Sequence, residues 1–365
     1  MLPKPQIVNL PVYQPGKPIE EVKKELGLQE VIKLASNENP FGCSSEVQAA
    51  ITQELTNVNL YPDGSAAELT ELLAEQLGVA KEQIIFGCGS DEIIALIARA
   101  FFLPGDETVM ADQTFSVYKS NADIEGALTI EVPLREGTHD LEAMQNAIGA
   151  KTKVVWICNP NNPTGTIVAK DELEAFLAGV PENVLVVLDE AYAEYVTDSN
   201  YLSGISLLNK YPNLVVLRTF SKIYGLASLR IGYGVGQPGV IKLINQVREP
   251  FNTSRFGQAA AKAALRDQRF VAECRSKNRE GISYLYQQFD RLGLSYFPAH
   301  GNFIMVDAQR PASEMFQAML KLGIIIRGGF AKYPSYVRVT VGSAEQNAKF
   351  VTALEQVLGQ PAARV

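Results

Sequence analysis

The chain has 365 residues, of which 47% are hydrophobic, and its 33 lysines and arginines stand against 40 aspartates and glutamates. A chain of this length usually exceeds what one hydrophobic core serves, so we expect a large domain and a smaller one. The mildly acidic balance, without a block of basic residues, argues against nucleic acid as a partner, and no apolar run approaches the length of a membrane span.

The amino end and the metal-binding residue types exclude further classes. Residues 1–6 lack the hydrophobic segment of a secretion signal, so we expect a cytoplasmic protein. Four cysteines are scattered without a Cys-x-x-Cys pair: Cys43, Cys88, Cys158 and Cys274. In a reducing compartment we interpret them as small buried hydrophobic residues. The two histidines, His139 and His300, are too few for a zinc cluster, so we expect no metal site.

Helical and extended segments alternate along the first part of the chain. Apolar residues at helical spacing predict helices over 68–77 and 91–102, the second ending before Pro104 and Gly105. Short strands are predicted at 84–86, 108–110 and 129–132. Three longer apolar runs predict buried strands ending near residues 158, 189 and 219. This alternation favours a mostly parallel sheet wrapped by helices, the α/β class.

The pattern changes after residue 233. Helices are predicted over 240–247 and 258–292, with Pro250 between them. The strands of a smaller sheet are predicted at 295–297, 303–306, 324–327 and 336–341. We place the domain boundary near residue 250. Residues 1–40 would form an arm packing on the small domain, 41–250 the large domain, and 251–365 the small α+β domain.

Each of the three long strands ends in polar groups. Asn162 follows the first, Asp189 closes the second, and Lys222 follows the third. A lone Ser-Lys pair is usually a solvated surface lysine. The carboxyl ends of parallel strands meet at one edge of a sheet, however, where ligands bind. Arg230, eight residues after Lys222, is suited to neutralise a phosphate.

A glycine-rich turn, Gly-Cys-Gly-Ser-Asp at residues 87–91, opens directly onto a predicted helix. Backbone amides at a helix amino end bind anions. A dinucleotide fingerprint is disfavoured, because Glu92 stands where that motif needs glycine. Ser90 or Asp91 acting as an ordinary helix cap is compatible with phosphate binding. Thr219, Ser221 and Arg230 would complete the phosphate site.

These motifs resemble the fold-type I pyridoxal-phosphate aminotransferases, of class II. The resemblance covers about residues 10–355, and two segments near the amino end, 13–22 and 33–40, are most similar to histidinol-phosphate aminotransferases. The matching residues are Asn162 in Asn-Pro-Thr-Gly, Asp189 and Tyr192 in Asp-Glu-Ala-Tyr, Lys222 in Ser-Lys, Arg230, and Arg338 in Val-Arg-Val-Thr-Val-Gly. The resemblance implies a large cofactor-binding domain and a smaller second domain.

The resemblance also implies pyridoxal 5'-phosphate as cofactor. Lys222 would carry it covalently and then move the substrate proton, while Asp189 would keep its ring nitrogen protonated. Tyr192 and Asn162 would donate hydrogen bonds to its phenolic oxygen. Phe115 would stack on its face, with an ordinary core phenylalanine as the alternative. Its phosphate would be held by Gly89, Ser90, Asp91, Thr219, Ser221 and Arg230.

Substrate contacts follow from the resemblance as well. Arg338 would clamp the α-carboxylate of glutamate or 2-oxoglutarate, unless it is a surface arginine at a strand edge. Arg327 would meet the distal charge, the phosphate of histidinol phosphate or the second carboxylate of glutamate. Tyr13 would cover the substrate ring, and Asn37 would also contact substrate. The alternatives are an aromatic amino-acid aminotransferase, a threonine-phosphate decarboxylase, or a non-enzymatic cofactor-binding protein.

Residues 59–63, Asn-Leu-Tyr-Pro-Asp, match the loop through which a partner subunit reaches the cofactor phosphate, with Tyr61 as donor. The resemblance therefore implies a two-fold homodimer. Two positions depart from the family. Gln113 stands where proline is usual and is expected to loosen the turn before Phe115. Arg255 is expected to add a cation near the substrate side.

Overall fold

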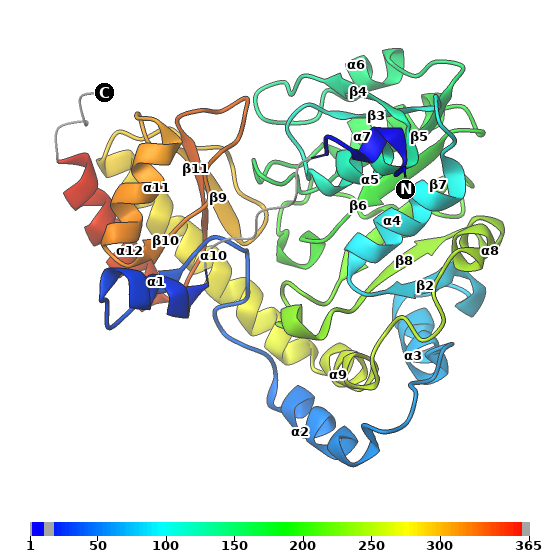
Figure 1. The fold of residues 1–365 in the computed structure, drawn as a ribbon, viewed down its shortest axis with the longest axis horizontal. Helices are drawn as coiled ribbons and strands as arrows, with labels where there is room; N and C mark the ends of the chain where they lie inside the picture. The colour runs from blue at the N-terminus through cyan, green and yellow to red at the C-terminus, as the bar shows by residue number, and fades with distance from the viewer. Residues whose placement is uncertain (1, 11–17, 360–365) are drawn as a thin grey trace.

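The computed structural model describes residues 2–10 and 18–359. A seven-stranded sheet lies at the centre of its larger part, with the strand order β2-β8-β7-β6-β5-β3-β4 (Figure 1). The strands are Ile84–Gly87 (β2), Glu107–Ala111 (β3), Leu128–Val132 (β4), Thr152–Cys158 (β5), Leu185–Asp189 (β6), Leu214–Thr219 (β7) and Gly232–Gly236 (β8). Strands β3 to β7 pair in parallel, as expected, whereas β8 is antiparallel to both β7 and β2.

Both faces of this sheet are covered. Alternate residues of β5 point to opposite sides, so Trp156 packs in the core under α4, α5 and α8, and Ile157 packs in the core on the other face. This two-sided burial explains the continuous apolar runs of β5, β6 and β7. The helices of this part are Ser45–Glu54 (α2), Ala67–Leu77 (α3), Ser90–Phe101 (α4), Val117–Glu125 (α5), Leu141–Asn146 (α6), Lys170–Gly179 (α7), Pro238–Gln246 (α8) and Arg255–Arg266 (α9). Short 3-10 helices lie at Pro5–Ile7 (η1), Leu55–Asn57 (η2), Lys81–Gln83 (η3), Ala193–Tyr195 (η4), Gly204–Leu207 (η5) and Ala227–Leu229 (η6).

Strand β8 is the one strand of the large sheet that the sequence pattern did not predict. Its glycines alternate with Tyr233 and Val235, so only every second residue brings a side chain to the core. A Cβ atom on Gly232 would lie 2.6 Å from the backbone nitrogen of Ser90. The glycine therefore allows the start of α4 to approach the sheet closely.

The smaller part has its own core, around α10 (Gln268–Arg291), α11 (Ala312–Lys321) and α12 (Ala344–Leu358). Strands β9 (Phe303–Asp307) and β11 (Tyr336–Thr340) pair in antiparallel fashion. Strand β10 (Ile324–Ile325) instead pairs in parallel with β1 (Ile32–Lys33) of the amino-terminal segment. The strand predicted at 295–297 is reduced to a single bridge between Tyr296 and Val306. The helix predicted over 258–292 is broken at Asp267, whose side chain caps α10.

The core contacts favour a domain boundary later than residue 250. The alanines of α9 and the first turns of α10, as far as Cys274, belong to the core of the large sheet. Leu285 and the rest of α10 belong to the second core, and Figure 1 shows this helix running from one part to the other. We therefore propose a boundary inside α10, because a long helix shared by two cores leaves no linker near residue 250.

The amino-terminal segment contacts both parts of the molecule. Val22 of α1 (Ile19–Leu26) and Val31 pack with Leu320 and Ile325, on the small domain. The first residues do not follow the expected arm: Lys4 pairs with Glu125 of α5, and η1 lies against that helix (Figure 1). Within residues 2–10 and 18–359, no helix combines the length and apolar character needed to cross a membrane.

Candidate active site

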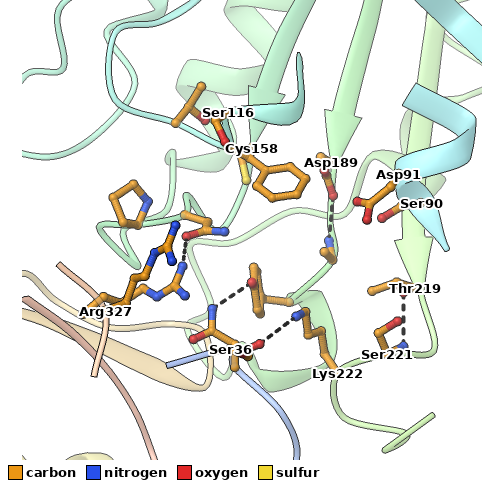
Figure 2. A pocket seen from close by; sticks show the side chains of 18 of the residues that line it. Ser36, Ser90, Asp91, Ser116, Cys158, Asp189, Thr219, Ser221, Lys222 and Arg327 are labelled. Carbon is orange, nitrogen blue, oxygen red and sulfur yellow. Dashed lines mark hydrogen bonds between the residues drawn. The ribbon is translucent and has the colours of Figure 1, made fainter. Parts of the chain in front are cut away.

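A cavity of about 440 Å³ lies at the carboxyl ends of β5, β6 and β7. The arm contributes residues 35–38 to its wall, and the small domain contributes Arg327 and Arg338. Figure 2 shows Lys222 between Ser36 and the strand ends, with Arg327 on the side away from Ser90, Thr219 and Ser221. The cavity is thus formed by three separate segments of the chain.

Most of the predicted site residues line this cavity. They are Asn37, Gly89, Ser90, Asp91, Phe115, Asn162, Asp189, Tyr192, Thr219, Ser221, Lys222, Arg230, Arg327 and Arg338. Tyr61 does not line it, and Tyr13 lies outside the described residues. Asn162, Asp189 and Lys222, which follow or close three neighbouring strands, therefore lie at one cavity.

Lys222 presents an amine that titrates near neutrality. Its Nζ donates to the backbone oxygen of Ser36 at 3.4 Å and lies 5.6 Å from the centre of the Tyr192 ring. Burial, reinforced by the positive charge of Arg338, lowers the pKa of Lys222 to about 8. A considerable fraction of the side chain is therefore an uncharged amine at physiological pH, which can act as a nucleophile or a base.

Asp189 presents a buried carboxylate with two fixed hydrogen bonds. The Tyr118 hydroxyl donates to its Oδ2 at 2.6 Å, and the backbone nitrogen of Ala191 donates to Oδ1 at 3.1 Å. Burial raises the pKa of Asp189 to about 6, although both hydrogen bonds oppose this. The group is still mostly ionised at pH 7.5. The sequence did not identify Tyr118; the only signal was a second aromatic residue three positions after Phe115.

The Tyr192 hydroxyl is oriented by Asn37. The Nδ2 atom of Asn37 donates to this hydroxyl at 3.0 Å, so the Tyr192 proton is directed to another acceptor. Asn37 is itself held by Thr340, whose hydroxyl bonds to its backbone nitrogen and to its Oδ1. Asn37 adopts a left-handed conformation with φ of 55°, a conformation that asparagine tolerates better than most residues.

Arg338 orients Asn162 in the same way. Its Nη1 donates to Oδ1 of Asn162 at 2.5 Å, and its Nη2 donates to the backbone oxygen of Ala35 at 2.7 Å. Because the carbonyl of the amide is engaged, its NH₂ group faces other partners. Arg338 is buried at 9% exposure, which excludes a surface arginine at a strand edge.

The far end of the cavity is suited to an anion. Buried hydroxyls of Ser90, Thr219 and Ser221 meet there at the start of α4. Arg230 Nη1 lies 3.4 Å from Ser221 Oγ, and Nη2 lies 3.4 Å from Asp91 Oδ2. Gly89 has a φ of 77°, which favours glycine, and a Cβ atom there would lie 2.6 Å from Arg230 Nη2 and displace that side chain. The Asp91 carboxylate orients Arg230 and repels an anion, so any contact of Asp91 with an anion must use its backbone nitrogen.

Gln113 connects the two walls of the cavity. Its backbone oxygen accepts from Asn161 Nδ2 at 3.1 Å, and its side-chain oxygen accepts from the backbone nitrogen of Lys332 at 3.3 Å. Lys332 Nζ also lies 3.5 Å from Asp112 Oδ2. Gln113 was expected to loosen the turn before Phe115. These contacts indicate the opposite, because Gln113 connects the turn to the segment that follows Arg327.

Comparison with known proteins identifies the family. The model of class I and II aminotransferases matches residues 29–354. The chain belongs to this family. The histidinol-phosphate aminotransferases of Brevibacillus brevis and Bacillus subtilis are 56% and 52% identical to it, over 98% and 97% of this chain and 99% of each relative.

Solved structures agree on the architecture of this aminotransferase. The histidinol-phosphate aminotransferase of Sinorhizobium meliloti, determined in complex with pyridoxal-5'-phosphate, superposes with a TM-score of 0.90 at 30% identity, over 97% of this chain and 96% of that one. An aspartate aminotransferase variant of Thermus thermophilus shares the fold, with a TM-score of 0.84 at 24% identity over 98% of this chain and 100% of that one. The predicted fold-type I class is therefore confirmed.

One expected cation of the aminotransferase site does not line the cavity of its own chain. Arg255 begins α9 and faces the segment after α2 instead. Its Nη2 donates to the backbone oxygen of Tyr61 at 2.8 Å, and Nη1 lies 3.4 Å from Glu54 Oε2. The Tyr61 ring stacks on Phe251 at 4.8 Å between ring centres and is 78% exposed. Arg255 therefore supports the exposed loop rather than the cavity.

Proposed function

We propose that this aminotransferase is a histidinol-phosphate aminotransferase that uses pyridoxal 5'-phosphate. It transfers an amino group between histidinol phosphate and 2-oxoglutarate, giving imidazole acetol phosphate and glutamate. The observation that carries the proposal is the presence of two cationic regions in the cavity. Arg230 lies beside Ser221, and Arg327 lies on the other side of Lys222 from Ser221 (Figure 2). A phosphorylated cofactor and a phosphorylated substrate together require two anion sites. The identity of 56% to the Brevibacillus brevis enzyme supports the same conclusion.

The residues around the cavity fit the cofactor. The three hydroxyls, the start of α4 and Arg230 suit a phosphate monoester. Asp189, a carboxylate held ionised inside the protein, suits a protonated ring nitrogen. The free protons of Tyr192 and Asn162 suit a phenolic oxygen, and Phe115 lines the cavity beside them. When bound, the cofactor accepts the electron pair released as the Cα–H bond of the substrate breaks.

Different side chains of the protein have different roles in the reaction. Lys222 accepts the proton from the substrate carbon and returns it, for which a pKa of about 8 is well matched. Asp189 places negative charge where the cofactor ring is positive. Tyr192 and Asn162 donate hydrogen bonds whose direction is fixed in advance by Asn37 and Arg338. Fixed donors need no rearrangement during the reaction, which lowers the barrier.

Recognition of two different substrates is assigned to the two arginines. Arg338 binds the α-carboxylate of glutamate, where histidinol phosphate carries a neutral hydroxymethyl group. Arg327 binds the distal anion of either substrate. A backbone bridge pairs Arg327 with Arg338 of β11, so both arginines belong to the small domain and lie side by side.

We expect Arg338→Ala to damage the glutamate half-reaction more than the histidinol-phosphate half-reaction. Both halves lose the support of Asn162, but only glutamate loses a partner for its α-carboxylate. Arg327→Ala should weaken both halves, and the phosphate substrate at least as strongly because its charge is larger. Each lost contact should reduce kcat/KM by about 30-fold to a few thousandfold. Single-turnover absorbance of each half-reaction measures this.

Arg269→Ala provides the matched control, because the Arg269 side chain is 89% exposed, pairs with Glu273 and lies outside the cavity. Its half-reactions should equal those of the parent protein. Equal losses in both halves for both cavity variants would contradict separate roles. Turnover of phenylalanine without any response to histidinol phosphate in the parent protein would favour the aromatic aminotransferase instead.

We also propose a homodimer in which Tyr61 reaches the partner's cofactor phosphate, in the cytoplasm. The support is a group of exposed apolar residues beside α9: Leu55, Val58, Leu60, Tyr61 and Phe251. Tyr61 is remote from the cavity of its own chain, yet its backbone is held in place by Arg255. An exposed apolar group with a fixed backbone is typical of an interface.

Tyr61→Phe is therefore expected to weaken cofactor affinity without changing the oligomeric state. One hydrogen bond to a charged phosphate is worth roughly 1.5–3 kcal/mol, or about ten- to a hundredfold in Kd. Equilibrium dialysis measures the affinity, and sedimentation velocity measures the mass. A monomeric parent protein, or unchanged affinity in the variant, would contradict the proposal.

A further inference from the structure

Tyr118, on α5, is fully buried and does not line the cavity, but it contacts a residue that does. Its hydroxyl donates to Oδ2 of Asp189 at 2.6 Å. This distance is typical of a bond from a neutral hydroxyl to an ionised carboxylate. Burial and the charge of Asp189 raise the pKa of Tyr118 well above its usual range, so the phenol keeps its proton and remains a donor.

The Tyr118 ring has little freedom to move. It stacks on Trp156 with ring centres 4.9 Å apart and planes 10° apart, and the Phe115 ring meets it edge-on at 5.6 Å. Trp156 is itself fixed, because its Nε1 donates to Thr108 Oγ1 at 2.9 Å. The hydroxyl is therefore placed by the packing of its ring between Trp156 and Phe115 rather than by the carboxylate that it bonds.

The surroundings of Asp189 otherwise disfavour its charge. Burial raises its pKa, and the carboxylates of Asp91, at the start of α4, and Glu190, next along the chain, raise it further. The hydrogen bonds from Tyr118 and from the backbone nitrogen of Ala191 act in the opposite direction and lower the pKa, and Tyr118 has the larger effect of the two. Two more titratable groups face Asp189 and stay neutral because burial raises the pKa of each: Cys158 of β5 and Tyr192 of the following loop.

We propose that Tyr118 is a positioning residue that fixes the orientation of the Asp189 carboxylate and keeps it ionised. With Tyr118 on Oδ2 and the Ala191 amide on Oδ1, the carboxylate cannot rotate without breaking two hydrogen bonds. The ionised carboxylate accepts the Tyr118 proton directly, whereas a neutral Asp189 would require the Tyr118 hydroxyl to turn its proton away and accept instead. The role toward a ring nitrogen rests on the proposed function; the effect on Asp189 itself does not.

The test is a pH titration of Asp189 in Tyr118→Phe and in the parent protein. It is monitored by ¹³C NMR of the full-length protein, labelled at the aspartate carboxyl groups and freed of cofactor. Asp189→Asn assigns the resonance. In the parent protein Asp189 should titrate near pH 6. Removing a hydrogen bond to a charged group should raise this midpoint by about one to two pH units, a ten- to hundredfold change in ionisation constant.

Tyr211→Phe is the matched control. Tyr211 is also buried, and its hydroxyl donates to a backbone oxygen, that of Glu174, remote from the cavity. Its loss should cost comparable stability and leave the Asp189 titration unchanged. A second readout is the affinity for pyridoxal 5'-phosphate at pH 7.5, which should fall roughly tenfold in Tyr118→Phe and not in Tyr211→Phe.

An unchanged or lowered Asp189 midpoint in Tyr118→Phe would overturn the proposal. If Tyr118→Phe does not fold, 3-fluorotyrosine at this position keeps the ring and strengthens the donor, and the midpoint should then fall; a constant midpoint overturns the proposal. A parent protein that shows the Asp189 shift but does not bind pyridoxal 5'-phosphate would instead contradict the proposed function.

Discussion

Lys222→Ala is expected to reduce transamination by about four orders of magnitude or more, because it removes both the covalent anchor and the base. The variant should still bind pyridoxal 5'-phosphate, since Ser90, Thr219, Ser221 and Arg230 are unchanged. Stopped-flow absorbance of the glutamate half-reaction measures the rate, and dialysis measures the binding.

Two controls sharpen this experiment. Lys242→Ala removes an exposed lysine of α8 and should leave turnover unchanged. Added methylamine should restore part of the activity of Lys222→Ala, because a small free amine supplies the missing base. Substantial turnover of Lys222→Ala without added amine would show that another group moves the proton.

Asp189→Asn is expected to reduce turnover about a thousandfold or more. The amide has the same shape and can still accept from Tyr118, but it carries no charge to stabilise a protonated ring nitrogen. Single-turnover rates with glutamate and with histidinol phosphate measure the loss, which should be similar in both, since the ring serves both halves.

A cofactor analogue methylated at the ring nitrogen tests the cause. Its nitrogen is permanently positive, so it should recover much of the lost rate in Asp189→Asn relative to the ordinary cofactor. Circular dichroism checks that the variant is folded. An Asp189→Asn rate close to that of the parent protein would show that Asp189 has a structural role only.

Most strands of the large sheet could be predicted from the sequence, because strands buried on both faces have a simple sequence pattern. Strands β5, β6 and β7 are covered on both sides and read as continuous apolar runs. Strand β8 was not predicted because Gly232, Gly234 and Gly236 contribute no apolar side chains to the pattern. Glycine at position 232 allows the close approach of α4. Its formation depends on the neighbouring strands and not on its own composition.

Residues of the cavity could be predicted when they directly follow strand ends. They could not be predicted when packing between separate helices and strands brings them to the site. Asn162, Asp189 and Lys222 belong to the first kind. Tyr118 belongs to the second, because its contact with Asp189 depends on how α5 sits on the sheet. Arg255 belongs to the second kind as well, because its departure from the family pattern did not reveal that α9 packs against α2.

The pairing of β1 with β10 has a practical consequence for protein engineering. Ile32 and Lys33 pair with β10 at the edge of the small domain, and the residues just after them provide the oxygen of Ala35 to Arg338 and the oxygen of Ser36 to Lys222. An amino-terminal deletion that stops at a domain border near residue 40 would therefore also remove contacts of the active site. Loss of activity after such trimming would report on missing catalytic contacts, whether or not the remaining protein stayed folded.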